Sequence, residues 1–472
     1  MPGILDKIDA GGLSAVHILL AICVTIHVLF HKRDIGASVG WIGLAWLSPI
    51  FGSILYFIFG INRVKRRASQ LREGRPVLPE AASPVMSAGR DDHLASLERA
   101  GDVITQNEAE RGNLVAILHN GGEAYPKMIA AIEAAEVSIA LSSYIFRADD
   151  TGNKFIEALI RARRRGADVR VLIDGIGGGY FLSPAYKRLR RNGVPACRFM
   201  HSTLPWRMPF LNLRTHKKIL ILDGRIAFTG GLNIGDENVL ANLPRHPVRD
   251  THLRFEGPVV AQLSRAFAAD WLLAAGEALA GGKWFPSLDK IGDAVARVIL
   301  SGPDEDIEKI EFMILEAIAC ARQSIKVMTP YFLPGERMIT ALALASMRGV
   351  KVDIIVPTRS NHLIIDWAMR PQIGPLVSAG CQIWRSPQPF DHSKIMTVDG
   401  IWCLIGGANW DVRSFRLNFE LDMEIYHSEI AQHLDALMAA TRATPITAAE
   451  LDSLPLALKL IDNGARLLLP YL

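Results

Sequence analysis

The chain of 472 residues is long enough for two or three packed units, each able to bury a core of its own. Half of its residues are hydrophobic and its mean hydropathy is positive, which is unusual for a protein with no lipid-embedded part. The 52 basic and 48 acidic residues leave a formal net charge of only +4, which argues against a nucleic-acid-binding protein. The five cysteines show neither C-x-x-C nor zinc-ligand spacing, so no disulfide framework or structural metal is expected, and a reducing compartment fits.

Two hydrophobic runs open the chain. Residues 13–30 and residues 39–59 carry no charged side chain and are 18 and 21 residues long. A helix needs roughly 20 apolar residues to cross the hydrocarbon core of a bilayer, so the first run is just long enough and the second is sufficient. Trp41, Trp46 and Tyr56 suit the membrane interface. Residues 1–67 are therefore expected to form a two-span transmembrane helical hairpin that anchors the protein in a bilayer.

A cleaved signal peptide is the alternative interpretation of the first run. The N-terminus carries Asp6 and Asp9 in place of a basic cluster, and basic residues rather than a small-residue cleavage site follow the run. Both features favour the hairpin. More basic residues flank its two ends than its short loop, so the positive-inside rule places the ends and the downstream chain in the cytoplasm. Those at the ends are Lys7, Arg63, Lys65, Arg66, Arg67 and Arg72, and those in the loop are Lys32 and Arg33.

The rest of the chain alternates strand-like with helix-like segments. Residues 68–102 form a polar stretch rich in Ala, Pro, Ser and Arg, which is typical of a linker with one short helix. Beyond it, the sequence RGADVRVLI at 165–173 has a counterpart in RGVKVDIIV at 348–356. The alternation indicates an α/β sandwich with a mixed sheet, and the counterpart indicates that the sandwich occurs twice. The expected halves are residues 103–300 and residues 301–472, the second ending in a C-terminal helix.

A sharper repeat lies within these halves. In both, a His-x-Lys sequence is followed by Asp-Gly, by Gly-Gly and by an asparagine, and the displacement is constant: 392 − 216 = 176 and 409 − 233 = 176. Agreement at so many aligned positions is not expected by chance. The polar members are His216, Lys218, Asp223 and Asn233 in the first half, and His392, Lys394, Asp399 and Asn409 in the second.

The repeat predicts one pocket for a phosphodiester. Residues two apart on an extended strand point to the same face, so each histidine and its lysine point together. If the halves pack about a pseudo-two-fold axis, one pocket receives two imidazoles, two ammonium groups and two amides. One imidazole can attack phosphorus while the other protonates the leaving alkoxide, and the lysines and asparagines hold the charged oxygens. This chemistry needs no metal and no cofactor, and the sequence has neither a carboxylate cluster suited to a metal nor a glycine-rich nucleotide motif.

The two sets match the His-x-Lys-x4-Asp motif of the phospholipase D superfamily. Nearly the whole chain resembles bacterial cardiolipin synthases, and segments that carry the resemblance are residues 144–146, 329–332, 409–414 and 418–420. The resemblance implies that His216 is the nucleophile, which forms a phosphatidyl-histidine, and that His392 is the general acid. It also implies that Asp250 and Glu420 each orient the histidine of the other half.

The same resemblance implies a reaction in the bacterial inner membrane. One phosphatidylglycerol would exchange its glycerol for a second phosphatidylglycerol, giving cardiolipin and glycerol. Asp223 and Asp399, the carboxylates of the motif, are expected to shape the turn rather than to react. Two alternatives stay open: a hydrolase of the same superfamily that uses water as the acceptor, and a catalytically inactive membrane scaffold, against which the intact histidines and lysines argue. The oligomeric state is also open.

Three positions depart from the family pattern next to the motifs. Thr215 and Asp391 stand where asparagine and leucine are usual, and Gly407 stands where the family has a serine. These changes remove no catalytic group, but they leave the donor headgroup and the accepting alcohol open. Residues 204–211 form an apolar, aromatic loop before the first motif, which either lines the core or forms a lip where acyl chains enter.

Overall fold

The computed structural model describes residues 10–31, 35–48, 50–57, 92–201, 213–303 and 306–469. They belong to two compact units, Met1–Gln70 and Leu71–Leu472. The basic residues expected to orient the hairpin, most of the expected linker and the apolar loop at 204–211 lie outside the described residues.

The described part of the first unit consists of apolar helices. They are α1 (Ala10–His31), α2 (Ile35–Leu47) and α3 (Phe51–Leu55). Among the described residues, α1 is the helix that is long and apolar enough to cross a membrane. The sequence predicts one long helix for the second hydrophobic run, whereas the structure divides that run between α2 and α3. Position 49 in the sequence is a proline, which disfavours a helical preceding residue and has no N–H to donate, so the break has a local cause.

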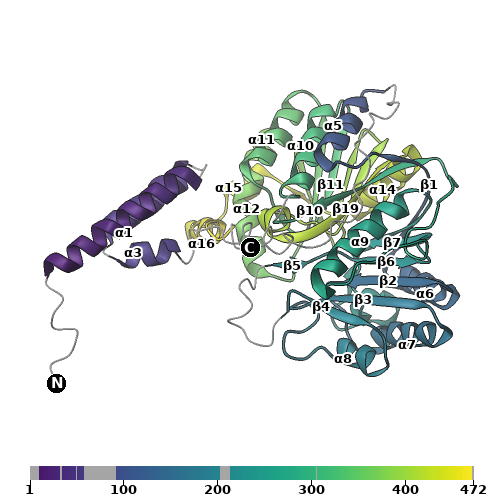
Figure 1. Ribbon diagram of the computed structural model, residues 1–472. Helices are drawn as coiled ribbons and strands as arrows, with labels where there is room; N and C mark the ends of the chain where they lie inside the picture. Colours follow the sequence, from purple (N-terminus) through teal and green to yellow (C-terminus); the bar gives the residue numbers. More distant parts are fainter. Residues whose placement is uncertain are drawn as a thin grey trace, which may run out of the picture. The chain divides into compact units, whose positions relative to one another are not determined.

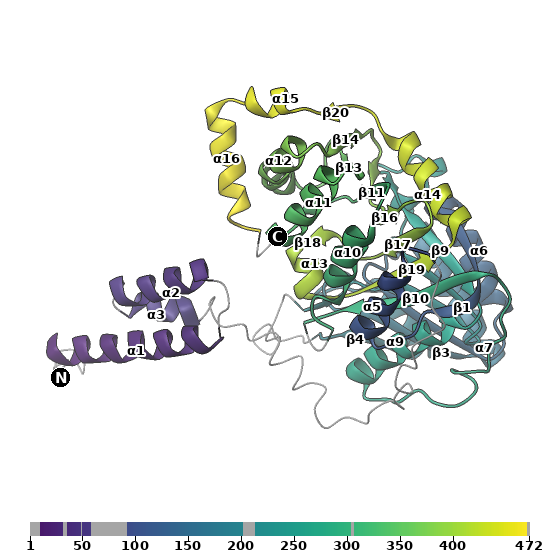
Figure 2. The same cartoon turned by 90° about the horizontal axis from the view of Figure 1, so that it is seen from above.

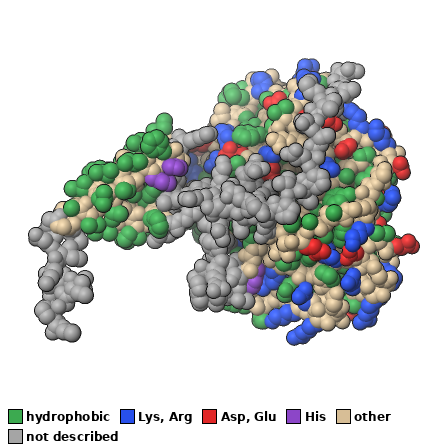
Figure 3. Space-filling model, viewed as in Figure 1, with side chains coloured by type: hydrophobic (Ala, Val, Ile, Leu, Met, Phe, Trp, Pro, Cys, Tyr) green, Lys and Arg blue, Asp and Glu red, His purple; other side chains and the backbone are tan. Residues whose placement is uncertain are grey.

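The helices of the first unit pack through a small inner cluster. Ala21, Val24, Val28 and Ala45 are buried there together with Tyr56, whose hydroxyl lies 2.7 Å from Nδ1 of His27. The outward side chains are mostly apolar and exposed, as Figure 3 shows for the face in view. A pair of helices that buries small and polar contacts inside and exposes apolar side chains outside is suited to contact with lipid.

A single mixed sheet runs through the second unit, and its central pair of strands joins the two halves (Figure 1). β1 and β10 pair antiparallel at this centre. From the centre outward, the first half continues with β9, β7, β6, β2, β3 and β4, and the second half continues in the equivalent order with β19, β17, β16, β11, β13 and β14. The inner strands are antiparallel, whereas β2, β3 and β4 of the first half and β11, β13 and β14 of the second are parallel. In the second half β20 is added antiparallel at the outer edge, beside β14. The expected pair of α/β halves with mixed sheets is confirmed.

The strands of the first half are β1 (Glu110–His119), β2 (Ser138–Ser143), β3 (Asp168–Asp174), β4 (Ala196–Phe199), β5 (Arg214–Thr215), β6 (Ile219–Leu222), β7 (Ile226–Gly230), β8 (Val248–Arg249) and β9 (Thr251–Glu256). Those of the second half are β10 (Ala294–Ser301), β11 (Ser324–Met328), β12 (Phe332–Leu333), β13 (Lys351–Pro357), β14 (Gln382–Ser386), β15 (Phe390–Asp391), β16 (Ile395–Val398), β17 (Trp402–Gly406), β18 (Trp410–Asp411), β19 (Asn418–Tyr426) and β20 (Pro445–Ile446).

Helices cover both faces of the sheet in each half (Figure 1). In the first half, α6 (Asn120–Ala134), α7 (Asp150–Arg165) and α8 (Pro184–Arg191) bury one face, and α9 (Val259–Ala275) covers the other. In the second half, α10 (Lys309–Cys320), α11 (Glu336–Met347) and α12 (Leu363–Ser378) share one core cluster, while α14 (Ser428–Thr441) packs on β16 and β17. The remaining helices are α5 (Ala95–Thr105), α13 (Val412–Arg416), α15 (Ala448–Asp452) and α16 (Leu456–Arg466), with short 3-10 turns at Asp236–Asn238 and Leu240–Asn242.

Two segments differ from the domain boundaries expected from the sequence. The end of the stretch expected to be a linker belongs to α5, whose Leu97 is fully buried in the core of the second half. The expected boundary at residue 300 falls within β10, which takes the same central place in the second half that β1 takes in the first. At the other end of the chain, α16 packs against α12 (Figure 2), and Arg370 donates a hydrogen bond of 2.8 Å to Asp462.

A buried ion cluster holds α5 on the central strands. Arg297 of β10 is fully buried and donates from Nε to Oε2 of Glu424 at 2.7 Å and from Nη1 to Oδ1 of Asp102 at 2.5 Å. Its Nη2 donates to the carbonyl oxygen of Glu98 at 3.2 Å. A buried charge is tolerated only when it is paired and hydrogen-bonded, as that of Arg297 is. Through these bonds Arg297 connects the start of the described catalytic unit to the middle of its sheet.

We expect Arg297→Ala to lower the free energy of unfolding by about 3–5 kcal/mol, because it leaves the carboxylates of Glu424 and Asp102 buried without their cation. Denaturant unfolding of the purified protein measures the change. The matched control is Lys127→Ala, which removes an exposed ion pair with Glu123 on α6; its expected loss is below about 1 kcal/mol. Equal effects of the two substitutions would contradict the role assigned to Arg297.

Candidate active site

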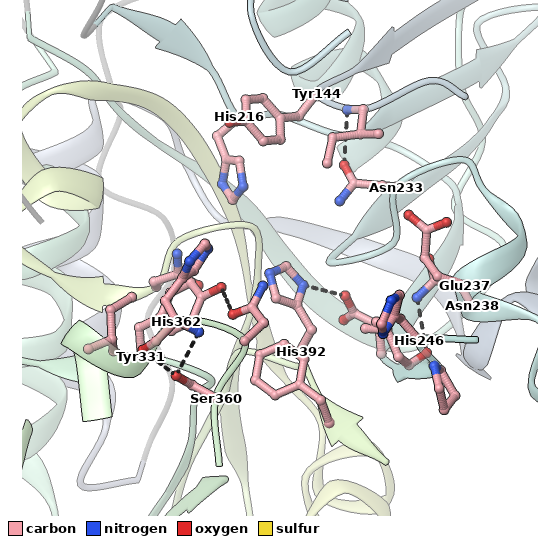
Figure 4. A pocket seen from close by; sticks show the side chains of 18 of the residues that line it. Tyr144, His216, Asn233, Glu237, Asn238, His246, Tyr331, Ser360, His362 and His392 are labelled. Carbon is pink, nitrogen blue, oxygen red and sulfur yellow. Dashed lines mark hydrogen bonds and ion pairs between the residues drawn. The ribbon is translucent and has the colours of Figure 1, made fainter. Parts of the chain in front are cut away.

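A cavity of about 1080 Å³ opens between the two halves and is lined by residues of both. His216 and His392, the histidines of the repeated motif, enter it from opposite sides with their rings toward one another (Figure 4). Both imidazoles are largely withdrawn from solvent. The two copies of the motif, which are 176 positions apart in the sequence, therefore build one site.

Each motif is held in place by a short strand that directly precedes it and pairs with a strand of the other half. β5, which directly precedes His216, pairs in parallel with β19 of the second half, and β15, which directly precedes His392, pairs in parallel with β8 of the first half. The backbone N–H of His216 donates to the carbonyl of Phe419 at 2.9 Å, and that of His392 donates to the carbonyl of Arg249 at 2.8 Å. This reciprocal pairing fixes where both histidine backbones enter the cavity.

The two supporting carboxylates are exchanged between the halves in the same way. Nδ1 of His216 lies 2.9 Å from Oε2 of Glu420, and Nδ1 of His392 lies 2.8 Å from Oδ2 of Asp250. Both carboxylates are buried. A carboxylate at Nδ1 favours the tautomer with its proton on that nitrogen, which leaves the lone pair of Nε2 available on the far side of each ring.

The lysines add positive charge to this buried space. Lys218 donates from Nζ to the carbonyl oxygen of His216 at 2.7 Å. Lys394 donates to the carbonyl oxygen of His392, and its Nζ lies 2.7 Å from Nδ1 and 3.0 Å from Nε2 of that ring. Burial lowers the pKa of Lys218 to about 7 and that of Lys394 to about 8. Burial outweighs the nearby carboxylates here, because desolvation penalises the charged form.

The histidines are held in their neutral form by the same environment. Burial and the adjacent lysines lower the pKa of His216 well below its ordinary value, and burial together with Lys394 lowers the pKa of His392 to about 3. Burial also raises the pKa of Glu420 to about 7, against the opposing effect of Lys218. A bound anion would relieve the repulsion among these cations, so the site is electrostatically suited to a phosphate group.

The two asparagines of the repeat also line the cavity. Asn233 accepts a hydrogen bond from the backbone N–H of Ile145 at 3.2 Å through its side-chain oxygen, which directs its amide nitrogen toward the cavity (Figure 4). Asn409 is buried and lines the cavity from the second half. The amide groups can therefore donate to the oxygens of a bound phosphate.

The motif carboxylates Asp223 and Asp399 lie away from the cavity, in the turns after β6 and β16. Both adopt a left-handed backbone, with φ of 52° at each. Asp223 accepts backbone N–H groups of Glu136, Val137 and Ser138. Asp399 accepts the equivalent N–H groups of residues 322–324 and also contacts Nε2 of His93 at 2.6 Å. Their contacts clamp each hairpin to the neighbouring strand, which matches the turn-shaping role expected of them.

The glycine pairs of the motif make room for the supporting carboxylates. A Cβ at Gly231 would lie 2.0 Å from Oδ1 of Asp250, and a Cβ at Gly407 would lie 3.2 Å from both Oε2 of Glu420 and the carbonyl of His216. The sequence predicts that these glycines let the backbone approach a ligand. In the structure they let the backbone approach the carboxylates that orient the histidines.

Two tyrosines of the site lie outside the repeated motif. The ring of Tyr144 meets His216 edge-on with centroids 4.8 Å apart, and the ring of Tyr331 meets His392 edge-on at 6.3 Å (Figure 4). Each follows the first strand of its parallel group, β2 or β11. Both lie in segments that carry the family resemblance, 144–146 and 329–332, although the sequence predicts no role for the tyrosines themselves.

No group of three or more His, Cys, Asp or Glu side chains that could hold a metal ion occurs in the part of the chain that the structure describes.

Two family models match the chain. A phospholipase D-like domain described as cardiolipin synthase matches residues 128–271 and 314–441, and a phospholipase D-nuclease N-terminal model matches residues 19–60. A cardiolipin synthase of Alkalihalophilus pseudofirmus is 33% identical over 486 residues, covering 100% of this chain and 96% of its own. The major cardiolipin synthase of Bacillus subtilis is 30% identical over 479 residues, covering 98% of this chain and 99% of its own.

A solved structure has the same fold. The phosphatidylserine synthase of Haemophilus influenzae superimposes with a TM-score of 0.62 at 14% sequence identity, covering 79% of this chain and 100% of that one.

Proposed function

Because this chain belongs to the cardiolipin synthase family, whose domains are phospholipase D-like, and is a phosphatidyltransferase acting on a phospholipid, we propose that its donor and its acceptor are both phosphatidylglycerol. The products are cardiolipin and glycerol. The observation that carries the proposal is the pair of histidines that face one another across a single buried cavity, each with its own carboxylate. Such a pair can break one phosphodiester and make another without an external energy source.

In the first step, Nε2 of His216 attacks the phosphorus of one phosphatidylglycerol. The bond from phosphorus to the glycerol oxygen breaks, and His392 gives that oxygen its proton. In the second step, His392 takes the proton from a hydroxyl of a second phosphatidylglycerol, the hydroxyl oxygen attacks phosphorus, and His216 leaves. The two lysines and two asparagines stabilise the charge on the phosphoryl oxygens in both transition states.

The assignment of His216 as nucleophile follows from membership of the phospholipase D-like family. Lys218 and Lys394 each donate to the carbonyl oxygen of their own histidine, and Nζ of Lys394 also lies 2.7 Å from Nδ1 and 3.0 Å from Nε2 of His392. When a phosphodiester binds between the lysines, its negative charge raises the pKa of His392 from the value of about 3, so that His392 gains the proton it must donate.

We also propose that the chain is a multi-pass protein of the bacterial inner membrane with its catalytic region in the cytoplasm. The match of residues 19–60 to an N-terminal family model, the apolar surface of α1 and α2 and the excess of basic residues at the ends of the hairpin support it. In this proposal residues 1–67 anchor the protein, and residues 68–102 link the anchor to the two halves, 103–300 and 301–472. The helix α5 and the strand β10 cross the boundaries at residues 102 and 300.

Expression in a host that lacks its own cardiolipin synthases tests the function. Chromatography of the lipids should show cardiolipin with the wild-type chain and a loss of at least about a thousandfold with His216→Ala or His392→Ala, because residues that act as a unit fail together. The matched control is His246→Ala, a histidine that lines the same cavity outside the motif, and it should retain most activity. Phosphatidic acid in place of cardiolipin would instead indicate a hydrolase, and no product at all would indicate an inactive scaffold.

The covalent intermediate can be trapped in one of the two variants. A donor with a nitrophenol leaving group needs no proton from the enzyme, so His392→Ala should react slowly and accumulate phosphatidyl-His216. His216→Ala should accumulate no adduct because it lacks the nucleophile. Mass spectrometry of peptides from both variants locates the phosphoryl group, and an adduct on His392 would reverse the assignment of the two roles.

Reporter fusions test the topology. A fusion near Arg90, in the expected linker, should report the cytoplasm, and a fusion near Asp34, in the loop of the hairpin, should report the opposite side, because basic residues are retained on the cytoplasmic side. The same reporter inserted at both places is its own control. A signal from the external side at Arg90 would contradict the proposed orientation.

A further inference from the structure

The helix α16 packs with a charged side chain inward and its leucines outward. Asp462 of α16 is buried against α12, where it accepts a hydrogen bond of 2.8 Å from Nη2 of Arg370, and Ala465 is buried in the core cluster of the second half. Figure 2 shows α16 beside α12. A surface helix of a globular protein normally has the opposite arrangement, with its apolar stripe toward the core and its polar side toward water.

The outward side of α16 and of the turn after it is apolar. Leu456, Leu460 and Leu467 are 73%, 66% and 75% exposed, and their spacing of four and seven residues places them on one side of the helix. Ile461 and Leu468 are exposed beside them. Single exposed leucines are ordinary on protein surfaces, whereas five large apolar side chains on one short helix and its turn form a patch. Such a patch marks an interaction surface.

Two basic residues border this patch. Lys459 and Arg466 are seven positions apart, so they lie on the same edge of the helix, between its outward side and its buried side. Nζ of Lys459 donates to the carbonyl oxygen of Asp452 at 2.7 Å, and Arg466 is exposed. Asn463 is polar on the outward side, and its amide nitrogen donates to the carbonyl oxygen of Lys459 at 2.8 Å. Helices that lie in the interface of an anionic bilayer have an apolar side with basic residues at its edge.

The helix that carries α16 also reaches the catalytic cavity. α12 begins at Leu363, which is exposed, and His362 and Ile365 at this end of the helix line the cavity. Arg370, which binds Asp462, lies further along the same helix. The apolar patch is therefore fixed, through α12, to one wall of the cavity.

We propose that α16 lies in the surface of the bilayer that contains the substrate, with Leu456, Leu460 and Leu467 among the acyl chains and Lys459 and Arg466 at anionic headgroups. The docked helix holds the cavity wall formed by α12 next to the lipid that enters the site. The proposal requires a phospholipid substrate, but it requires neither of the two phosphatidylglycerol assignments made above.

Three observations favour lipid over protein as the occupant of the patch. The chain is a phosphatidyltransferase acting on a phospholipid, so its catalytic unit must meet a lipid surface. The helices of the first unit have the same arrangement, with small and polar contacts inside and exposed apolar side chains outside. The basic edge of the patch complements the negative charge of phospholipid headgroups.

Photocrosslinking identifies what covers the patch. Full-length protein with Leu460→benzoylphenylalanine is reconstituted in vesicles of phosphatidylglycerol and phosphatidylethanolamine and irradiated, and mass spectrometry identifies what is joined to the peptide containing position 460. A lipid adduct is the expected result. The matched control is Val137→benzoylphenylalanine, an exposed apolar position just before β2, at the end of that strand away from the cavity. It should give at most about a tenth of the adduct.

Three other outcomes at position 460 would overturn the proposal: an adduct with residues 1–70, an adduct with a second copy of the chain, and the absence of any adduct above the level of the control.

The form of the substrate tests whether docking supports turnover. Release of labelled headgroup is measured from long-chain phosphatidylglycerol in vesicles and from dihexanoyl phosphatidylglycerol dissolved as monomers. Leu460→Asn combined with Leu467→Asn should lower the rate with vesicles at least about tenfold, because the transfer of two exposed leucines into acyl chains is lost. The rate with the dissolved substrate should stay within about twofold, since the substitutions are on the surface.

Two further variants serve as controls. Leu460→Phe combined with Leu467→Phe keeps the apolar surface and should retain the rate with vesicles, and Val137→Asn should change neither rate. Activity with the dissolved substrate also shows that each variant is folded.

Equal loss with both substrates would give the leucines a structural role and overturn the proposal, as would no loss with either. A wild-type chain that releases no headgroup from phosphatidylglycerol would show that the proposed donor is wrong. The crosslinking result would then still decide whether α16 lies in the bilayer, because it requires no turnover.

Discussion

The exchange of carboxylates between the two halves is the constraint on which the rest of the structure depends. His216 is oriented by Glu420 and His392 by Asp250, so neither half can build a working imidazole without the other. The central pairing of β1 with β10 and the short cross-pairs of β5 with β19 and β15 with β8 set the distance between the halves. The glycines of the motif are explained by the same contacts, since larger residues at Gly231 would displace Asp250.

The site concentrates ionisable groups where water is excluded. Two lysines with lowered pKa values, two neutral histidines and Glu420 with a raised pKa are packed within the sheet. Burying such groups is unfavourable for folding unless they are paired. Here each lysine experiences the positive charge of the other lysine as well as the negative charge of the carboxylates. The surrounding sheet and core must offset this cost. A bound substrate phosphate adds negative charge beside the lysines, so binding of such a ligand stabilises the folded site.

The duplicated site performs an asymmetric reaction. One imidazole must form a bond to phosphorus and the other must carry a proton, although both come from the same motif. In the structure each ring has a carboxylate at Nδ1, and the division of roles between the two rings is the one proposed above. Duplication thus gives two equivalent halves of one phosphate pocket.

The sequence by itself determined the class of fold, the duplication and the main reacting groups. These features are local: the alternation of apolar segments, the constant displacement of 176 and the motif residues can each be found without knowing the path of the chain. The break of the second apolar run into α2 and α3 is also encoded locally, at Pro49.

Only the tertiary structure decided the contacts that join the halves. The family resemblance implied that Asp250 and Glu420 each orient the histidine of the other half, but the two residues are 170 positions apart, so the displacement of the motif does not relate them. Their contacts with the histidines depend on the cross-paired strands. The burial of α5 in the second half and the clamping of strands by Asp223 and Asp399 are likewise set by long-range packing. Local patterns carry no information about such packing, because its energy arises between segments that meet only when the whole sheet has formed.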